Sequence, residues 1–126
     1  MYRVNLDVIN KIICIEVSGS MSLKEINNLV VDIDDLVTKF HQGQYSMLIK
    51  AQRLDPISQE NIPAFQQVME IALKWANEVV IVYGNRTVTR MQLSRMETDA
   101  RTKTNSNTPI VIFHVMNEAI NYLNRI

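Results

Sequence analysis

The chain has 126 residues, 47% of them hydrophobic, and its 13 basic residues balance 13 acidic ones. This length suits one domain over residues 1–126, and so apolar a chain can bury a core without a metal or disulfide staple. The balanced charge argues against a nucleic-acid partner, because binding to phosphates normally requires a basic excess. The single cysteine, Cys14, excludes an intrachain disulfide and, inside an apolar run, is expected to be a buried, inert thiol.

Targeting and membrane segments are not expected. Residues 2–8 already alternate like a strand and contain no apolar signal-peptide core. No apolar stretch approaches the roughly 20 residues needed to span a bilayer. We therefore expect a cytoplasmic protein without an integral membrane segment.

Two strand-like runs open the chain. Residues 2–8 place apolar side chains on one face, which predicts a half-buried strand with Tyr2, Val4, Leu6 and Val8 inward. Residues 11–17 are nearly all apolar, which predicts a central strand covered on both faces. Because the turn at residues 10–11 is short, these strands should form an antiparallel hairpin.

A helix should follow the hairpin. Ser22 and Glu25 have the spacing of a capping box, in which each side chain satisfies a free backbone N–H at the helix start. The helix is expected to run to about Gln42. Its apolar residues lie on one stripe, formed by Ile26, Leu29, Val30, Ile33, Val37 and Phe40.

The remaining chain alternates between strands and helices. Strands are predicted at residues 45–51, 78–83 and 109–115, and helices at 87–101 and 116–126, the last with Met116, Ala119, Ile120 and Leu123 inward. The second long helix should begin with Asn61 as its N-cap, because Pro63 then falls in the first turn, and end near Asn77. Strands joined through helices should be parallel. The sequence therefore predicts an α/β fold: a mixed sheet of five strands, with an N-terminal antiparallel hairpin and then β-α units, and about four helices.

The second helix has an unusually wide apolar arc. Beside the stripe expected to face the sheet, it carries a second stripe at helical spacing, formed by Ala64, Val68, Ile71 and Trp75. An apolar flank with an aromatic anchor is typical of a surface for a protein partner or for self-association, which points to Ile71 and Trp75. Alternatively, neighbouring helices or the last turn cover this flank.

Basic residues gather around the start of the third helix. Arg86 and Arg90 lie where a strand-to-helix loop and a helix N-terminus favour anion binding. Residues 84–87, however, match neither a dinucleotide-binding nor a P-loop motif. A solvated helix face is the alternative interpretation.

The sequence carries no recognisable set of catalytic or metal-binding groups. His41 and His114 are isolated from each other and from the one cysteine, whereas a metal site needs clustered ligands. No G-x-S-x-G elbow is present for serine hydrolase chemistry. We therefore expect neither an enzyme nor a bound cofactor or metal.

The order of elements and several segments resemble the STAS/SpoIIAA-like family, the anti-sigma-factor-antagonist fold, over essentially the whole chain. The matching segments are Val17-Ser18-Gly19, Ser22-Leu23-Lys24-Glu25, Asp55-Pro56-Ile57-Ser58, Met91-Gln92-Leu93-Ser94-Arg95 and Asn117-Glu118-Ala119-Ile120-Asn121-Tyr122-Leu123. In that family the loop before the second helix can carry a serine whose phosphorylation switches binding to a partner kinase, in the pattern Asp-Ser-Ser-Gly. Here Asp55 matches, but Pro56 and Ile57 replace the serines and Ser58 replaces the glycine, so the resemblance does not carry the phospho-switch.

The resemblance implies a non-enzymatic module, regulatory or scaffolding, that acts through protein–protein contacts. The expected contact surfaces are the loop of residues 53–58, with Arg53, Asp55 and Ser58, and the flank formed by Ile71 and Trp75. Two alternatives stay open: a domain that binds a small apolar ligand or a membrane surface, and a homo-oligomeric subunit of a phage-derived assembly. Fold alone does not choose among these.

Overall fold

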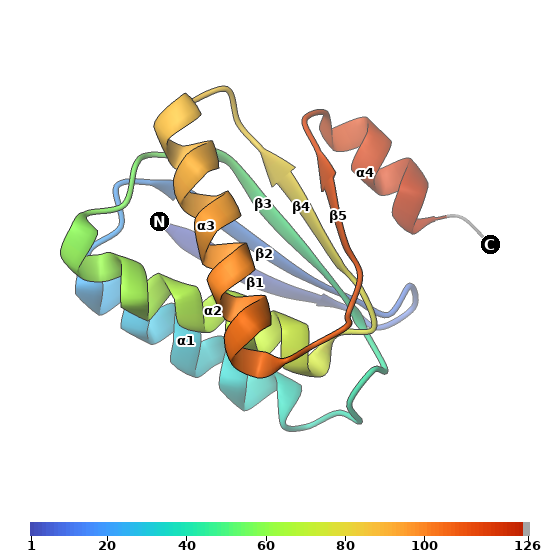
Figure 1. Cartoon of the computed structure of the whole chain (residues 1–126). Coiled ribbons are helices and arrows are strands. Elements are labelled where there is room, and N and C mark those ends of the chain that lie inside the picture. Colours follow the sequence, from blue (N-terminus) through green and yellow to red (C-terminus); the bar gives the residue numbers. More distant parts are fainter. Residues whose placement is uncertain (125–126) are drawn as a thin grey trace.

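The computed structural model describes residues 1–124 and has the predicted order of strands and helices, with one added 3-10 turn. In chain order the elements are β1 (Tyr2–Asp7), β2 (Ile12–Gly19), α1 (Leu23–Val37), β3 (Ser46–Leu54), the 3-10 turn η1 (Gln59–Asn61), α2 (Ile62–Trp75), β4 (Val79–Tyr83), α3 (Thr87–Thr104), β5 (Ile110–Phe113) and α4 (Met116–Leu123) (Figure 1). The expected last helix extended to residue 126, so its final two residues lie outside the described part.

The strands form one sheet in the order β1-β2-β3-β4-β5. The hairpin pair β1–β2 is antiparallel and every later pair is parallel, as the short first connection and the later helical crossovers require. Helices α1, α2 and α3 cover one face of the sheet, and α4 lies on the other (Figure 1). The predicted α/β fold class is confirmed.

The two faces of the sheet are unequally covered. The main core lies between the sheet and α1–α3, and includes Ile15, Ile26, Ile49, Phe65 and Ile81. The core under α4 is much smaller, with four buried residues: Leu48, Val80, Val82 and Ala119. Because α4 contacts β4 and β5, the β1–β2 part of that face is not packed under a helix in the part of the chain that the structure describes.

This unequal cover corrects the prediction for β2. Its side chains alternate: Ile13 and Val17 are buried toward the main core, whereas Cys14 and Glu16 on the opposite face are only half-buried. The strand is therefore not covered on both faces, and Cys14 is not fully buried. Desolvation still raises the pKa of the Cys14 thiol, which keeps it in the less reactive neutral form.

The hairpin turn is longer than predicted. Residues 8–11 form it, and Val8, expected to face inward, is 62% exposed. The Asp7 carboxylate accepts hydrogen bonds from the backbone and side chain of Asn10, at 3.0 and 2.8 Å, and this local Asx turn ends β1 before Val8. Lys11 then takes a φ of 56°.

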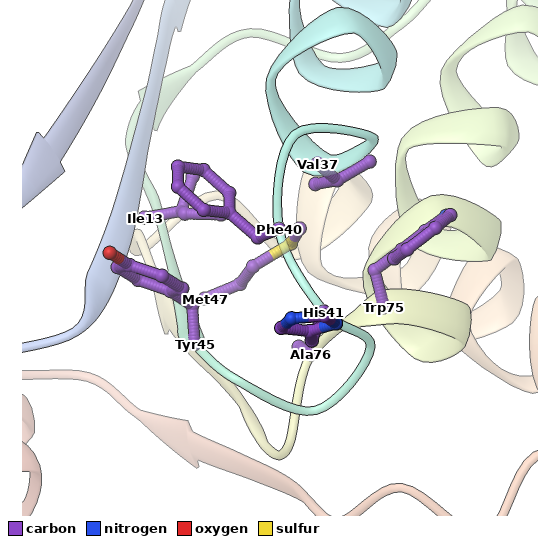
Figure 2. Close-up of a pocket in the computed structure, with 8 residues that line it drawn as sticks. All are labelled: Ile13, Val37, Phe40, His41, Tyr45, Met47, Trp75 and Ala76. Carbon is purple, nitrogen blue, oxygen red and sulfur yellow. The ribbon is translucent and has the colours of Figure 1, made fainter.

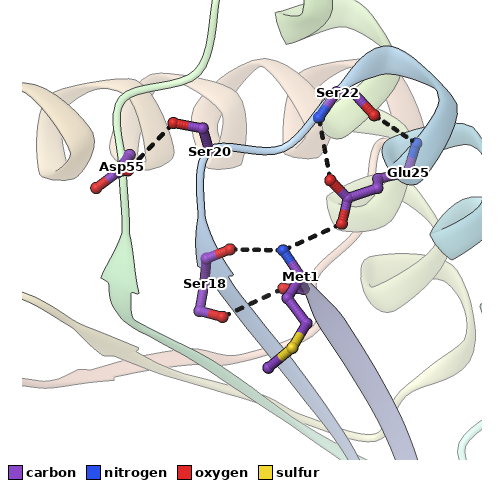
Figure 3. Close-up of polar contacts among 6 residues, drawn as sticks. All are labelled: Met1, Ser18, Ser20, Ser22, Glu25 and Asp55. Carbon is purple, nitrogen blue, oxygen red and sulfur yellow. Dashed lines mark hydrogen bonds and ion pairs between the residues drawn. The ribbon is translucent and has the colours of Figure 1, made fainter.

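The start of α1 matches the predicted capping box. Glu25 N donates to Ser22 Oγ at 3.2 Å, and Ser22 N donates to the Glu25 carboxylate (Figure 3). The amino group of Met1 lies 3.1 Å from the same carboxylate, and these contacts lower the pKa of Glu25. The helix ends earlier than Gln42: Thr38 is its C-cap, and Phe40, in the following turn, still packs with its ring centroid 4.6 Å from that of Tyr45.

The later helices differ from prediction mainly at their ends. Asn61 is the residue before α2 and Pro63 lies in its first turn, as predicted, although the Asn61 side chain makes no capping hydrogen bond. In α4, Ala119 is buried but Ile120, predicted inward, is 40% exposed. Within residues 1–124, no helix is both long enough and apolar enough to cross a membrane.

Candidate protein-interaction site

The carboxyl ends of the parallel strands meet at one edge of the sheet, and Asp55 lies at their centre. Its carboxylate accepts a hydrogen bond at 3.2 Å from the hydroxyl of Ser20, just after β2 (Figure 3). The same carboxylate forms an ion pair with Arg86, at the start of α3. Its backbone N–H donates to the carbonyl of Gly19 at 3.1 Å. Asp55 therefore connects the ends of β2 and β3 to the β4–α3 connection.

Side chains of helix α3 hold the 53–58 loop by hydrogen bonds to its backbone at two positions. Thr89 Oγ1 donates to the carbonyl of Leu54 at 3.2 Å. The Gln92 side-chain amide binds both backbone groups of Ile57, accepting from its N–H and donating to its carbonyl, each at 2.8 Å. The Ile57 side chain is buried, so the loop is held by polar bonds from one side and apolar packing beneath.

We predict that Gln92→Ala loosens this loop, because it leaves the N–H and carbonyl of Ile57 without their partner. The expected cost is about 1 kcal/mol of unfolding free energy, with faster hydrogen exchange at the Ile57 amide. Denaturant unfolding and exchange measured by NMR test both effects. Ser94→Ala, at an exposed position of the same helix, is the control; an unchanged exchange rate at Ile57 in Gln92→Ala would contradict the described loop.

Strand β3 runs further than the predicted residues 45–51, so Arg53 and Leu54 of the 53–58 loop are the last two residues of that strand. The outer side of the loop is accessible. Arg53, Pro56 and Ser58 are exposed, and within residues 1–124 the side chain of Arg53 has neither a hydrogen bond nor an ion pair. Ser58 is the residue before η1, and its hydroxyl makes no capping bond. Arg53 also borders a groove of about 330 Å³ that is lined by Lys50, Glu16 and Met116, among others. The predicted contact residues Arg53 and Ser58 thus lie at the surface, whereas Asp55 is half-buried and uses its carboxylate to hold the loop in position.

The two arginines predicted for anion binding both make contacts inside the chain. Arg86 pairs with Asp55, and Nε of Arg90 donates to the carbonyl of Gly84. Their geometry therefore holds the β4–α3 connection in place, and the charge of Arg86 is already balanced. Anion binding by Arg86 and Arg90 stays a prediction.

The second predicted surface, the Ile71/Trp75 flank, lies near the other end of α2. Helix α2 contacts both α1 and α3, which explains why apolar residues extend so far around it, and Val68 of the second stripe is fully buried. Ile71 and Trp75 are half-buried. At 1.5 Å per residue, α2 is about 21 Å long, so the structure does not bring the flank and the 53–58 loop together.

Trp75 borders a small cavity with Val37 and His41 (Figure 2). Its volume is about 10 Å³, roughly what one water molecule needs. The Lys74 ammonium lies 5.8 Å from the centroid of the Trp75 ring. This cavity is too small for an apolar ligand.

Titratable groups with shifted pKa values gather between α3 and β4. Tyr83 is buried, its hydroxyl donates to the Glu97 carboxylate at 3.4 Å, and His114 meets the Tyr83 ring edge-on. Burial raises the pKa of both Tyr83 and Glu97. Within residues 1–124, no three His, Cys, Asp or Glu side chains are placed to hold a metal ion.

We predict that Glu97→Gln stabilises the protein at neutral pH. When folding raises the pKa of a carboxyl group, the group contributes its full stability to the folded state at pH values below its unfolded pKa. That stability is lost as the pH rises through the folded pKa. The glutamine stays neutral and can still accept from Tyr83. The melting temperature of the variant should therefore exceed that of the parent at pH 7 and approach it near pH 4. Glu60→Gln, at an exposed position of η1, is the control; a lower melting temperature for Glu97→Gln at pH 7 would contradict the assignment.

Neither a protein-family model nor a curated protein matches the sequence of this chain. Solved structures do match its fold. An uncharacterized protein of the DUF3478 family from Shewanella loihica PV-4, described as having a SpoIIAA-like fold, superposes with a TM-score of 0.68 at 11% identity, over 98% of this chain and 92% of its own. An anti-sigma factor antagonist from Mycobacterium paratuberculosis gives a TM-score of 0.61 at 10% identity, over 99% and 96%. The chain therefore has the SpoIIAA-like, or STAS-like, α/β fold.

Proposed function

We propose that the chain is a regulatory protein–protein interaction module without enzymatic activity, and that its partner binds at the 53–58 loop. The observation that carries this proposal is that the outer side of the loop is exposed and yet the loop is fastened, by Asp55 to the end of β2 and to the β4–α3 connection, and by Gln92 to α3. The likeness in fold to an anti-sigma factor antagonist supports a regulatory role.

These bonds to the loop matter for binding, because a flexible loop loses conformational entropy when a partner orders it, and that loss weakens the affinity. A loop already held in one conformation avoids much of that cost, so a modest surface can bind specifically. Arg53 and Ser58 offer a charge and a hydroxyl to the partner, and Pro56 adds a rigid apolar contact between them. Asp55 acts indirectly, by holding the loop in position.

Site-specific photo-crosslinking tests the proposal. A photoreactive phenylalanine derivative placed at Ser58, in cells of the native host, should give a discrete protein adduct identifiable by mass spectrometry. The same derivative at Asn27, on the exposed side of α1, is the matched control. Asp55→Ala in the Ser58-labelled chain should reduce the adduct. Equal adduct patterns at Ser58 and Asn27, or none at Ser58, would overturn the proposal.

A second candidate function is self-association through the Ile71/Trp75 flank, as in a scaffold or assembly subunit. It is favoured by one observation: the only tryptophan and Ile71 are half-buried rather than fully covered. Light scattering over a concentration series tests it. A stable dimer or larger oligomer that Ile71→Asp dissociates would support this candidate, and a monomer at all concentrations would remove it.

A further inference from the structure

Strand β5 forms an edge of the sheet that has no strand beside it. It pairs only with β4, and within residues 1–124 no further strand lies beyond it. At the start of this ladder the N–H of Val79 donates to the carbonyl of Pro109 at 2.9 Å. Because hydrogen-bonding groups alternate in direction along a strand, those of Ile110 and Ile112 point away from β4. Among residues 1–124 these backbone groups have no hydrogen-bond partner, so they can pair with an added strand.

Strand β5 is also unusually apolar for an edge strand that has no neighbouring strand on one side. Proteins commonly protect edge strands with charged side chains, prolines or bulges. The opposite edge, β1, alternates apolar residues with Arg3, Asn5 and Asp7. In contrast, all four residues of β5, Ile110–Phe113, are apolar, and only the preceding Pro109 interrupts the run.

A groove runs along this edge on the side of α3. Its volume is about 690 Å³, and Tyr83 and Ile112 line it from the sheet while Met91 and Ser94 line it from α3. Met91 is 67% exposed and Ile112 is 40% exposed. Within residues 1–124, α3 covers Ile112 only in part, so a strand added to β5 would place alternate side chains beside Met91 and Ile112.

The charges on the groove indicate what kind of strand fits. Arg90 and Arg95 line its α3 wall, with Asp99 as the one acidic group. Within residues 1–124, Arg95 has neither an ion pair nor a hydrogen bond. A second copy of this chain would bring two more arginines and one more aspartate to the same place, which leaves an excess of positive charge. An acidic segment would instead complement Arg95.

We propose that β5 binds an extended segment of a partner protein as a sixth strand, and that this segment carries alternating apolar side chains and an acidic residue that faces Arg95. The main-chain bonds to Ile110 and Ile112 would supply affinity, and the groove side chains would select the sequence. This surface is separate from the 53–58 loop, so either proposal can fail without the other.

Two short synthetic peptides test this proposal with the full chain. Both alternate valine and threonine; one carries a glutamate at each end and the other a lysine. Fluorescence anisotropy should show tighter binding of the glutamate peptide, and NMR shifts should concentrate at residues 110–114 and on the groove side of α3. Arg95→Glu should reverse the preference between the two peptides.

A matched pair of variants separates backbone pairing from side-chain contact. Ile112→Pro removes an outward N–H without breaking a bond to β4, whereas Ile112→Thr keeps that N–H. The proline variant should bind the glutamate peptide about tenfold more weakly than the threonine variant, the equivalent of one or two lost hydrogen bonds. Equal binding by both variants, no preference for the glutamate peptide, absence of shifts at residues 110–114, or a β5-mediated homodimer that Ile112→Pro dissociates would each overturn the proposal.

Discussion

Replacing Phe65 by alanine should lower the unfolding free energy by about 3–5 kcal/mol. Phe65 lies on α2, its side chain is 0% exposed, and it is among the largest fully buried side chains of the core between the sheet and α1–α3. Removing the ring loses its apolar burial and leaves a cavity that the surrounding strands and helices can fill only in part. Urea unfolding monitored by circular dichroism measures the loss.

Val88→Ala is the matched control for this prediction. Val88 lies in the first turn of α3 with more than half of its surface exposed, and substitutions at such positions usually change stability by less than about 0.5 kcal/mol. A loss below about 1 kcal/mol for Phe65→Ala would mean that α2 does not pack on the sheet as described.

Replacing Gly84 by alanine should destabilise the protein by about 1–3 kcal/mol and disturb the proposed interaction site. A Cβ atom at Gly84 would lie 2.2 Å from the carbonyl oxygen of Gln52 and 2.9 Å from its carbonyl carbon. Both atoms belong to the backbone of β3, so the strand or the β4–α3 connection must move. Because the Gly84 carbonyl accepts from Arg90, the start of α3 should shift as well.

The measurement for Gly84→Ala combines chemical unfolding with amide hydrogen exchange. Exchange should become faster around residues 54–57, because α3 fastens the loop there. Asn85→Ala is the control, since Asn85 is the exposed neighbour in the same connection. Equal stability of the two variants would show that Gly84 and Gln52 do not approach each other so closely.

The features that the sequence predicted well depend on residues close together in the chain. Spacings within a few turns of helix predict the capping box of Ser22 and Glu25, the apolar stripe of α1 and the start of α2 just after Asn61. The ends of helices were predicted less accurately. Helix α1 stops at Val37 because the N–H groups of Lys39 and Phe40 donate to carbonyls three residues back, not four, although Phe40 keeps the apolar spacing.

The site shows the limit of that reasoning. The sequence indicated the 53–58 loop as a contact surface, but not the side chains that hold this loop in place. Thr89 and Gln92 bind backbone groups 35 residues away, and Arg86 pairs with Asp55 across 31 residues. Because α3 is only weakly amphipathic, its sequence does not indicate which of its polar side chains bind distant parts of the chain. Their role emerges only when the crossover places α3 beside the end of β3.

The sequence by itself determined the order of the elements, the antiparallel hairpin and the parallel crossovers, because periodicity, capping and connection length are local properties. Tertiary structure decided which surfaces are left open. It placed α2 against both α1 and α3, which buries Val68 of the second stripe but leaves Ile71 and Trp75 half-buried, and it placed α4 over only part of its face of the sheet. It also left the edge of β5 unpaired, because β5 is the last strand of the sheet that residues 1–124 form.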